Sequence, residues 1–299
     1  MRYLLRVRVS GPCFGSMEQR IFDFTDAQLT AETARDGVLN LVVGSDGISL
    51  LATNAFGRPL ALQAQHFMPA GRSFVQTEAD IRRVFGEEAL LTHLYSRVRC
   101  AFSNLNATLV PRRMFQPDDL SRYFSMLLHS GDYAYGYTAL PDFDCNVVYA
   151  MEPAVQRLLG QYFPDAQLTH LAATLLPAYR ANSARSGHEV FLHLRQSSLY
   201  LTVFDRQNLL YFNAFQFKQA NDVLYYTLLA YEQFRLSPLD TPLMVTGHLL
   251  EDADVYRLLQ RYCRLLRFGS LRDSFQLPVS AGHLPAHYFY DLYTLQTTG

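Results

Sequence analysis

The stretch LNLVVGSDGISLL, residues 39–51, has one apolar run on each side of Gly44-Ser45-Asp46-Gly47. Apolar runs bounded by glycine and aspartate predict two β-strands joined by a short connection. The same connection could cradle a phosphate, because glycine lets backbone N–H groups approach an anion closely. We interpret Asp46-Gly47 as a hairpin turn, since Asp-Gly is a preferred pair for two-residue turns.

This hairpin begins a pattern that recurs half a chain later. Residues 38–67 predict three strands with turn compositions between them, and residues 189–217 have the same rhythm. Ile48 matches Leu199, 151 residues later, and Leu60 matches Leu210, 150 residues later. One residue is therefore lost in a turn, where a deletion is easily tolerated. The matching order and spacing favour an internal duplication.

The elements after each strand triplet also correspond. A helix is predicted from Thr77 and from Asn221, each with residues suited to a helix start. A strand follows at 107–111 and at 242–247. Then come two stretches whose apolar residues lie at i, i+3, i+4, i+7 and i+8, which predicts one apolar face on a helix. These residues are Leu120, Tyr123, Phe124, Leu127 and Leu128 in the first half, and Val255, Leu258, Leu259, Tyr262 and Cys263 in the second.

The rest of the first half is predicted as a strand at 145–151, a helix at 153–163 and a strand at 167–176. Residues 177–189 are polar and are predicted to bridge the halves, so we expect domains at 1–180 and 181–299. The fold class is α/β. A duplicated βββαβαβα unit predicts two tandem ribonuclease H-like lobes, each with a mixed five-stranded sheet flanked by helices, which is the actin-like ATPase architecture.

Composition excludes several classes of protein. The net charge is −1, from 26 Lys and Arg against 27 Asp and Glu, which argues against a nucleic-acid-binding surface. The four cysteines, Cys13, Cys100, Cys145 and Cys263, form no Cys-x-x-Cys pair, so we predict reduced thiols in a cytoplasmic protein. The scattered histidines predict no metal site. No apolar run reaches the length of a transmembrane helix, so no membrane insertion is expected.

Six segments of the chain resemble a family of uncharacterised Bacteroidetes proteins that has this two-lobed fold. That family is distantly similar to the actin-like protein of type IV pilus assembly. The resemblance implies fold more than function, because the family has no established activity. The segments are LNLVVGSDGISL (39–50), ATLVPRRMF (107–115), NVVYAM (146–151), YFPDAQLTH (162–170), residues 209–238 and PLMVTGHL (242–249).

The resemblance implies where a nucleotide would bind: an Asp-x-Gly element in the first hairpin of each half and a Gly-Gly turn near the nucleoside. The first hairpin has Ser45 at the aspartate position, and the second, residues 195–198, has neither glycine nor acid. Residues 246–248 keep one glycine of two. We therefore predict a degenerate cleft with no catalytic residue and no metal ligand. Its candidate nucleotide or anion contacts are Asp46, Gly47, Arg195, Ser197, Ser198 and Gly247.

Two further features left alternatives open. Tyr133, Tyr135 and Tyr137 share one face of a predicted strand, as a half-buried stripe or as a peptide-binding edge. The C-terminal tail, with Phe289, Tyr290 and Tyr293, either packs back on a lobe or forms a docking segment; we favour packing.

We expect a non-catalytic scaffold, a pseudoenzyme that binds an unknown protein partner, with a homodimer as a candidate state. The alternative is an actin-like ATPase or small-molecule kinase with an atypical nucleotide site. Its best remaining groups are Asp46, Asp205 and Gly247.

Overall fold

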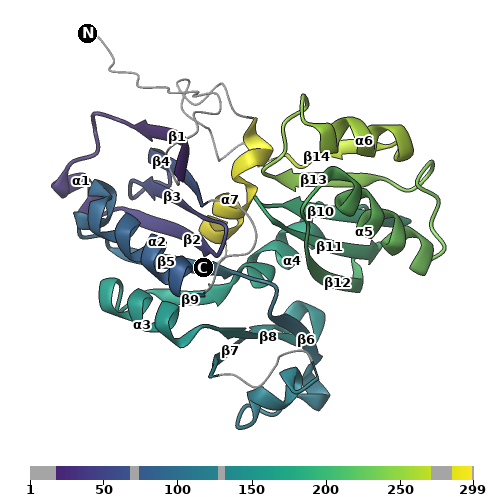
Figure 1. Cartoon of the computed structure of the whole chain (residues 1–299), viewed down its shortest axis with the longest axis horizontal. Helices are drawn as coiled ribbons and strands as arrows, with labels where there is room; N and C mark the ends of the chain where they lie inside the picture. The colour runs from purple at the N-terminus through teal and green to yellow at the C-terminus, as the bar shows by residue number, and fades with distance from the viewer. Residues whose placement is uncertain (1–17, 68–73, 127–131, 271–284, 298–299) are drawn as a thin grey trace.

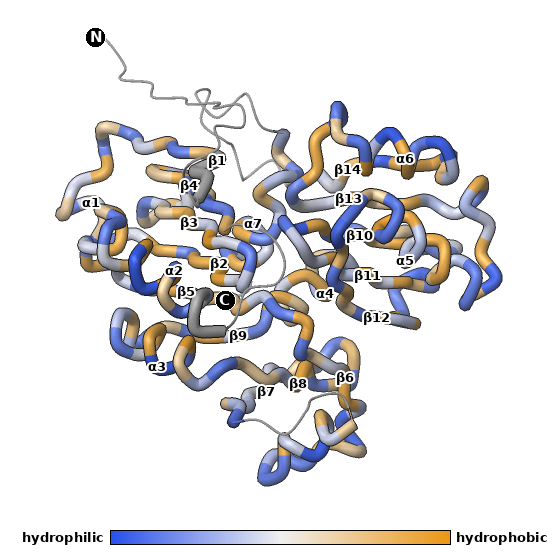
Figure 2. Tube along the Cα trace, viewed as in Figure 1, coloured by the Kyte–Doolittle hydropathy of each residue, from blue (hydrophilic) through white to orange (hydrophobic). Residues whose placement is uncertain are grey.

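A computed structural model describes residues 18–67, 74–126, 132–270 and 285–297 of the chain. The fold is α/β, with mixed sheets covered by helices (Figure 1). Figure 2 shows that hydrophobic residues dominate the central strands, which matches their burial. In the described part of the chain no helix is long and apolar enough to cross a membrane.

The first sheet has the strand order β1-β4-β3-β2-β5-β9. Strands β1 to β4 pair antiparallel, whereas β5 runs parallel to β2, and β9 parallel to β5. This sheet has six strands rather than the five expected, because β1 adds to the edge of β4. The strands are β1 (Glu18–Thr25), β2 (Val38–Gly44), β3 (Gly47–Thr53), β4 (Pro59–Phe67), β5 (Arg97–Ser103) and β9 (Gln167–His170).

The second sheet has the order β12-β11-β10-β13-β14. An antiparallel meander is again followed by two parallel strands. The predicted triplets therefore form β2–β4 and β10–β12, in the same order within each sheet. The strands are β10 (His188–Leu194), β11 (Ser198–Asp205), β12 (Asn208–Gln216), β13 (Leu243–Gly247) and β14 (Leu266–Phe268).

A third, three-stranded sheet consists of β6 (Ala107–Pro111), β8 (Cys145–Met151) and β7 (Ala134–Leu140), in that order. The prediction that residues 107–111 correspond to 242–247 is wrong, because β5 holds the place beside β2 that β13 holds beside β10. Strand β5 was missed because Arg97 and Arg99 interrupt its apolar pattern. Tyr135 and Tyr137 lie in an edge strand, β7, and Tyr133 directly precedes it, which leaves both interpretations of the tyrosine stripe open.

Four of the five predicted helices are present, at 74–87, 153–162, 220–233 and 254–262, whereas the helices at 31–35, 171–182 and 290–297 were not predicted. The predicted helix from Leu120 is only a 3₁₀ turn, Leu120–Phe124, and Leu127 and Leu128 lie outside the described residues. The helices are α1 (Ala31–Arg35), α2 (Phe74–Glu87), α3 (Pro153–Tyr162), α4 (Leu171–Asn182), α5 (Ala220–Gln233), α6 (Asp254–Tyr262) and α7 (Tyr290–Thr297). Four other 3₁₀ turns are described: η1 (Ala89–Thr92), η2 (Arg112–Met114), η4 (Pro141–Phe143) and η6 (Ala286–Phe289).

The prediction of a strand to residue 176 and a polar bridge from residue 177 is wrong, because residues 171–182 form helix α4. Strand β9 ends at His170. The His170 side chain accepts a hydrogen bond from the Ala172 N–H and so caps the helix that follows. Helix α4 contacts strands of all three sheets and α7, and most of its residues are buried. A helix buried on several sides has no polar face, so its apolar run resembled a buried strand.

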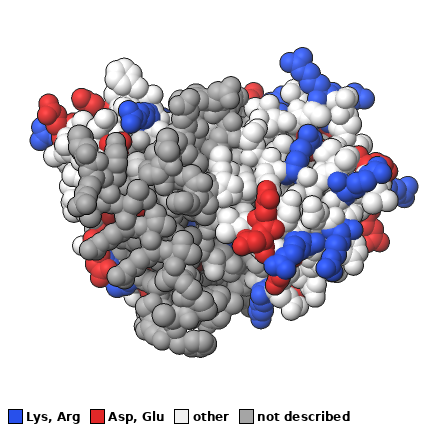
Figure 3. Space-filling model, turned by 90° about the horizontal axis from the view of Figure 1, so that it is seen from above, with Lys and Arg blue, Asp and Glu red and all other residues white. Residues whose placement is uncertain are grey.

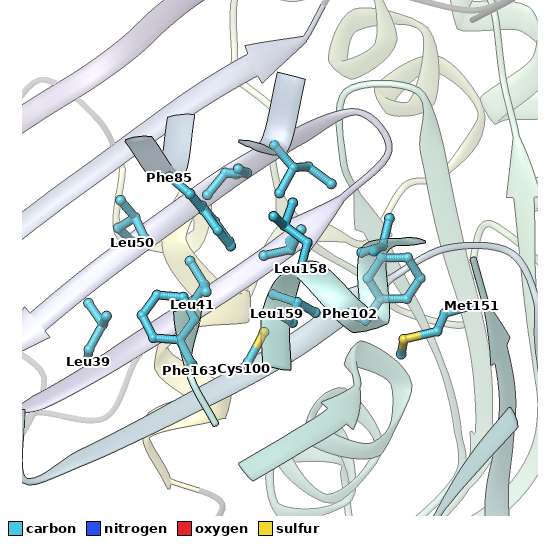
Figure 4. Packing of buried hydrophobic residues seen from close by; sticks show 14 of the residues in the cluster. Leu39, Leu41, Leu50, Phe85, Cys100, Phe102, Met151, Leu158, Leu159 and Phe163 are labelled. Atoms are coloured by element: carbon cyan, nitrogen blue, oxygen red, sulfur yellow. The ribbon is translucent and has the colours of Figure 1, made fainter. Parts of the chain in front are cut away.

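The core of the first sheet lies between the strands and the two helices α2 and α3. Figure 4 shows leucines of β2 and β3 meeting Phe85 of α2 and Leu158 and Leu159 of α3. The opposite face of the same sheet packs against α4 and α7. Helix α7 thus lies against β2, β3 and β5 and also contacts β13, so the end of the chain joins the two large sheets.

Candidate functional site

The β2–β3 turn and the β10–β11 turn face each other and touch. Gly44 pairs with Gly47, so Ser45 and Asp46 form the centre of the first turn. The Asp46 carboxylate accepts hydrogen bonds at 3.3 Å from the Ser197 backbone N–H and from the Ser198 hydroxyl. A hairpin is therefore confirmed. Gly47 is required there because a Cβ at this position would overlap the Gln65 carbonyl oxygen of β4.

Arg195 lies between two carboxylates in the interior. Its Nε donates to Asp46 Oδ1 at 3.2 Å, and its Nη1 donates to Asp291 Oδ2 at 2.7 Å. The three side chains are 1%, 5% and 1% exposed for Arg195, Asp46 and Asp291. We call these three residues the buried triad. It joins the first hairpin, the second hairpin and α7.

Charge balance explains how an arginine is accommodated at this depth. Burial lowers the pKa of the Arg195 guanidinium, but Asp46 and Asp291 outweigh burial and raise it, so the group stays charged. Burial raises the pKa of Asp291, and Arg195 opposes that rise. A buried ion is stable only with partners of opposite charge and satisfied hydrogen bonds, and Arg195 has both.

Three histidines surround the buried triad. The His66 ring stacks on His248 with ring centres 4.7 Å apart, and His248 stacks on Tyr288 at the same distance. His193 Nδ1 lies 3.0 Å from the Thr246 hydroxyl. One ring nitrogen of each histidine is buried without a hydrogen-bond partner among the described residues. Burial lowers the pKa of His66 to about 4 and of His193 to about 3, and takes that of His248 well below 6.5. All three rings are therefore neutral at pH 7.

Gly247 lies behind this cluster, at the end of β13. Its φ is +85°, and a Cβ there would overlap the Leu194 carbonyl oxygen.

We expect Gly247→Ala to reduce the free energy of unfolding by about 2–3 kcal/mol, because left-handed strain and the overlap both destabilise the folded chain. Gly187 is the matched control: it has φ +82° but nothing within 4 Å of its Cβ position. Gly187→Ala should cost only about 1 kcal/mol in urea unfolding. Equal losses in the two variants would contradict this explanation.

The six predicted contact residues divide into two groups. Asp46, Gly47, Arg195, Ser197 and Ser198 lie together at the meeting point of the turns, where Arg195 Nη2 also lies 3.4 Å from the Gly47 carbonyl oxygen. Gly247 is one step away, paired with Leu194. Asp205, named for the enzyme alternative, is at the other end of β11 from Ser198, about 20 Å away.

Sequence reasoning missed Asp291, His66, His193 and His248. Asp291 lies in the tail, whose predicted packing is confirmed for residues 285–297, with Phe289, Tyr290 and Tyr293 all buried. No local pattern marks these four residues, because they come from separate elements. Among the described residues, no group of three or more His, Cys, Asp or Glu side chains could hold a metal ion. Cys100, Cys145 and Cys263 are free thiols, and Cys13 lies outside the described residues.

This arrangement has the parts of an anion cradle. A backbone N–H, a hydroxyl and a guanidinium converge on one point, as they do around a bound phosphate. The anion at that point is the chain's own Asp46 carboxylate.

Away from the site, basic side chains lie beside acidic ones on the half of the surface that contains α6 (Figure 3). The pairs there include Arg257–Asp254 and Arg264–Asp240.

Comparisons with known proteins agree with this fold. A structure from Bacteroides thetaiotaomicron, described as a protein with actin-like ATPase fold and unknown function, matches with TM-score 0.74 and 17% identity, over 91% of this chain and 100% of that one. A chain of the PilM–PilN type IV pilus biogenesis complex matches with TM-score 0.55 and 14% identity, over 87% and 97%.

A search of curated proteins found no match. At such identities the structural matches establish the fold alone, and they confirm the resemblance expected from the six segments. The family model described as "Protein of unknown function (DUF3822)" matches residues 26–266. The chain therefore belongs to the DUF3822 family and has the actin-like ATPase fold.

Proposed function

We propose that this chain is a non-catalytic actin-like scaffold, a pseudoenzyme, that binds a protein partner. The observation that carries the proposal is the buried triad. Arg195 and the Ser197 N–H, which could hold a phosphate, hold the Asp46 carboxylate instead. A nucleotide phosphate would have to displace a carboxylate that is already hydrogen-bonded and dehydrated, and it would then leave Asp46 buried without a partner.

The architecture also supports an internal duplication. Strands β4-β3-β2-β5-β9 and β12-β11-β10-β13-β14 share order and relative direction, as expected of two ribonuclease H-like lobes at 1–180 and 181–299. The small sheet β6-β8-β7 is then an insertion in the first lobe. Helix α7 packs largely against the first lobe, so the lobes are joined by more than their connecting segment.

The expected partner is a protein. The similar chain from the PilM–PilN complex shows that this fold can serve in an assembly with another protein. The balanced charge and interspersed surface signs support the absence of nucleic-acid binding. Reduced thiols support a cytoplasmic location.

Calorimetric titration with ATP and ADP, with and without Mg²⁺, tests the proposal. We expect no binding heat from the wild type at nucleotide concentrations near about 1 mM, a range that detects affinities of about −4 kcal/mol. Asp46→Ala should gain weak anion binding, because Arg195 and the Ser197 N–H lose the carboxylate that they hold.

The enzyme alternative predicts the opposite pair of results. Micromolar, Mg²⁺-dependent binding by the wild type that disappears in Asp46→Ala would refute the scaffold proposal. It would establish an atypical nucleotide site around Asp46, Arg195 and Gly247. Ser45→Ala is the matched control, because Ser45 shares the turn with Asp46 but makes none of the described contacts with Arg195, Ser197 or Ser198.

A further inference from the structure

Four polar side chains gather at the start of strand β5, which lies between β2 and β9 in the first sheet (Figure 1). Register places Asn40 of β2 and Gln167 of β9 directly beside Arg99, one on each side. Side chains in register share a face of the sheet, and so does Arg97, two residues before Arg99. It is the face covered by α7, because the residues two further along β2 and β5 pack against that helix. We call these four residues the β5 polar cluster.

The polar atoms of this cluster have no partners among the described residues. Asn40 is 0% exposed, and both its amide nitrogen and its amide oxygen are buried without a hydrogen bond. Arg99 is 8% exposed, and its Nε is buried in the same condition. The Arg97 and Gln167 side chains are exposed, and neither pairs with a described residue. Buried polar groups destabilise a fold unless something supplies the missing partners.

Arg99 differs from the other buried arginine in its charge environment. Arg195 has Asp46 and Asp291 as partners, and they raise its pKa. Burial lowers the pKa of Arg99, Arg97 lowers it further, and no described carboxylate opposes them. Two guanidiniums therefore lie close together without a counter-charge, an arrangement that attracts an anion from solution.

The chemistry of the cluster defines the anion. Two guanidiniums favour a ligand with two negative groups, and Arg99 can bind a carboxylate through two parallel N–H groups. Each amide adds N–H donors, and also an oxygen that needs a donor. A dicarboxylate that carries a hydroxyl supplies all of these partners. An ammonium in place of the hydroxyl would be repelled by the two arginines.

We propose that the β5 polar cluster binds a small hydroxylated dicarboxylate, with Arg99 as the main contact to a carboxylate. Arg97 and Gln167 are exposed and meet the ligand first, whereas Asn40 lies furthest from solvent. The site is separate from the two turns, because Asn40 lies four residues, about 13 Å, before Gly44 along β2. The proposal therefore does not depend on the nucleotide site.

Calorimetric titration of the full chain with malate, at constant ionic strength, tests this site. We expect saturable binding with a dissociation constant between about 10 µM and 1 mM. Succinate has the same two carboxylates without the hydroxyl, so it should bind about three- to tenfold more weakly. Aspartate has an ammonium where malate has the hydroxyl, and it should also bind more weakly than malate.

Three arginine variants locate the binding. Arg99→Met should weaken malate binding at least about tenfold, because it removes a charge-assisted pair of hydrogen bonds. Without ligand, its urea midpoint should stay level or rise, since Arg99 leaves no carboxylate unpaired, whereas Arg195→Met should lower the midpoint. Arg113→Met is the matched control, because Arg113 is exposed and pairs with no described residue. Its malate affinity should stay within about twofold of the wild type.

No saturable binding of malate up to about 10 mM would refute the site. Equal affinities for malate, succinate and aspartate would contradict the assignment of a hydroxylated ligand. Equal weakening by Arg99→Met and Arg113→Met would mean that malate is attracted only by general surface charge. A urea midpoint that fell as far in Arg99→Met as in Arg195→Met would show that Arg99 already has an anionic partner within the chain, which would also overturn the proposal.

Discussion

Replacing Arg195 with methionine should lower the free energy of unfolding by about 3–5 kcal/mol. The side chain is 1% exposed and is held by Asp46 and Asp291. Methionine fills much of the same volume but leaves two carboxylates buried without their cation. The cost arises mainly from those orphaned charges, since the pair itself contributes little relative to a well-packed apolar core. Guanidinium unfolding followed by circular dichroism measures the loss.

Arg264→Met is the control for this prediction. Arg264 pairs with Asp240 at 2.7 Å, as close as Arg195 to Asp291, but the two side chains are 63% and 71% exposed. Such a pair is worth at most about 1 kcal/mol. A second test removes the orphaned charges: Arg195→Met combined with Asp46→Asn and Asp291→Asn should be more stable than Arg195→Met alone. If the triple variant were instead the least stable protein, the explanation by buried charge would be wrong.

The buried triad also shows how far the sequence can predict this site. Asp46 and Arg195 were selected because each lies in a turn between two recognisable strands, and the duplication placed those turns in corresponding positions. Asp291 carries no such mark, because it lies in a short terminal helix far from both turns in the chain. Its role depends on α7 packing against β2, β3 and β5, which is a tertiary contact.

The fold shows the same contrast between elements that local sequence marks and elements that depend on tertiary contacts. Strands β2–β4 and β10–β12 were predicted because their apolar runs are separated by strong turn residues. Strand β5 was missed because Arg97 and Arg99 begin it, and α4 was mistaken for a strand because it is buried on several sides. Hydrophobic periodicity and turn residues indicate local structure. They do not report which neighbours an element has, and those neighbours decided both errors.

The buried histidines predict a loss of stability in mild acid. In the folded chain the pKa is about 4 for His66 and His170, about 3 for His193, and well below 6.5 for His248, with burial the largest cause in each. Arg195 lowers the pKa of three of them further, whereas Asp46 opposes this at His66. At His170, neutrality lets Nδ1 accept from Ala172 while Nε2 lies 3.2 Å from Asn104 O.

The direction follows from proton linkage. Once unfolded, each histidine regains a pKa near 6.5, so the unfolded chain binds more protons below that pH. The contribution of the neutral rings is fully present above pH 6.5 and is lost as pH falls toward 4. The four protons that these histidines take up on unfolding contribute about 5 kcal/mol per pH unit to the slope near pH 5. Since domains are stable by only about 5–15 kcal/mol, we expect acid unfolding close to that pH.

Urea unfolding between pH 5 and 8 measures this slope. His66→Gln should reduce it by about 1.4 kcal/mol per pH unit, the value for one proton. Tyr288→Phe is the control from the same ring stack, because burial raises the pKa of that hydroxyl and it takes no part below pH 7. A stability that stayed level from pH 7.5 to 5 would mean that water or a hydrogen-bonding partner reaches these ring nitrogens. The histidines would then not be buried as neutral groups. The closed contact between the two turns, which buries them, would also be contradicted.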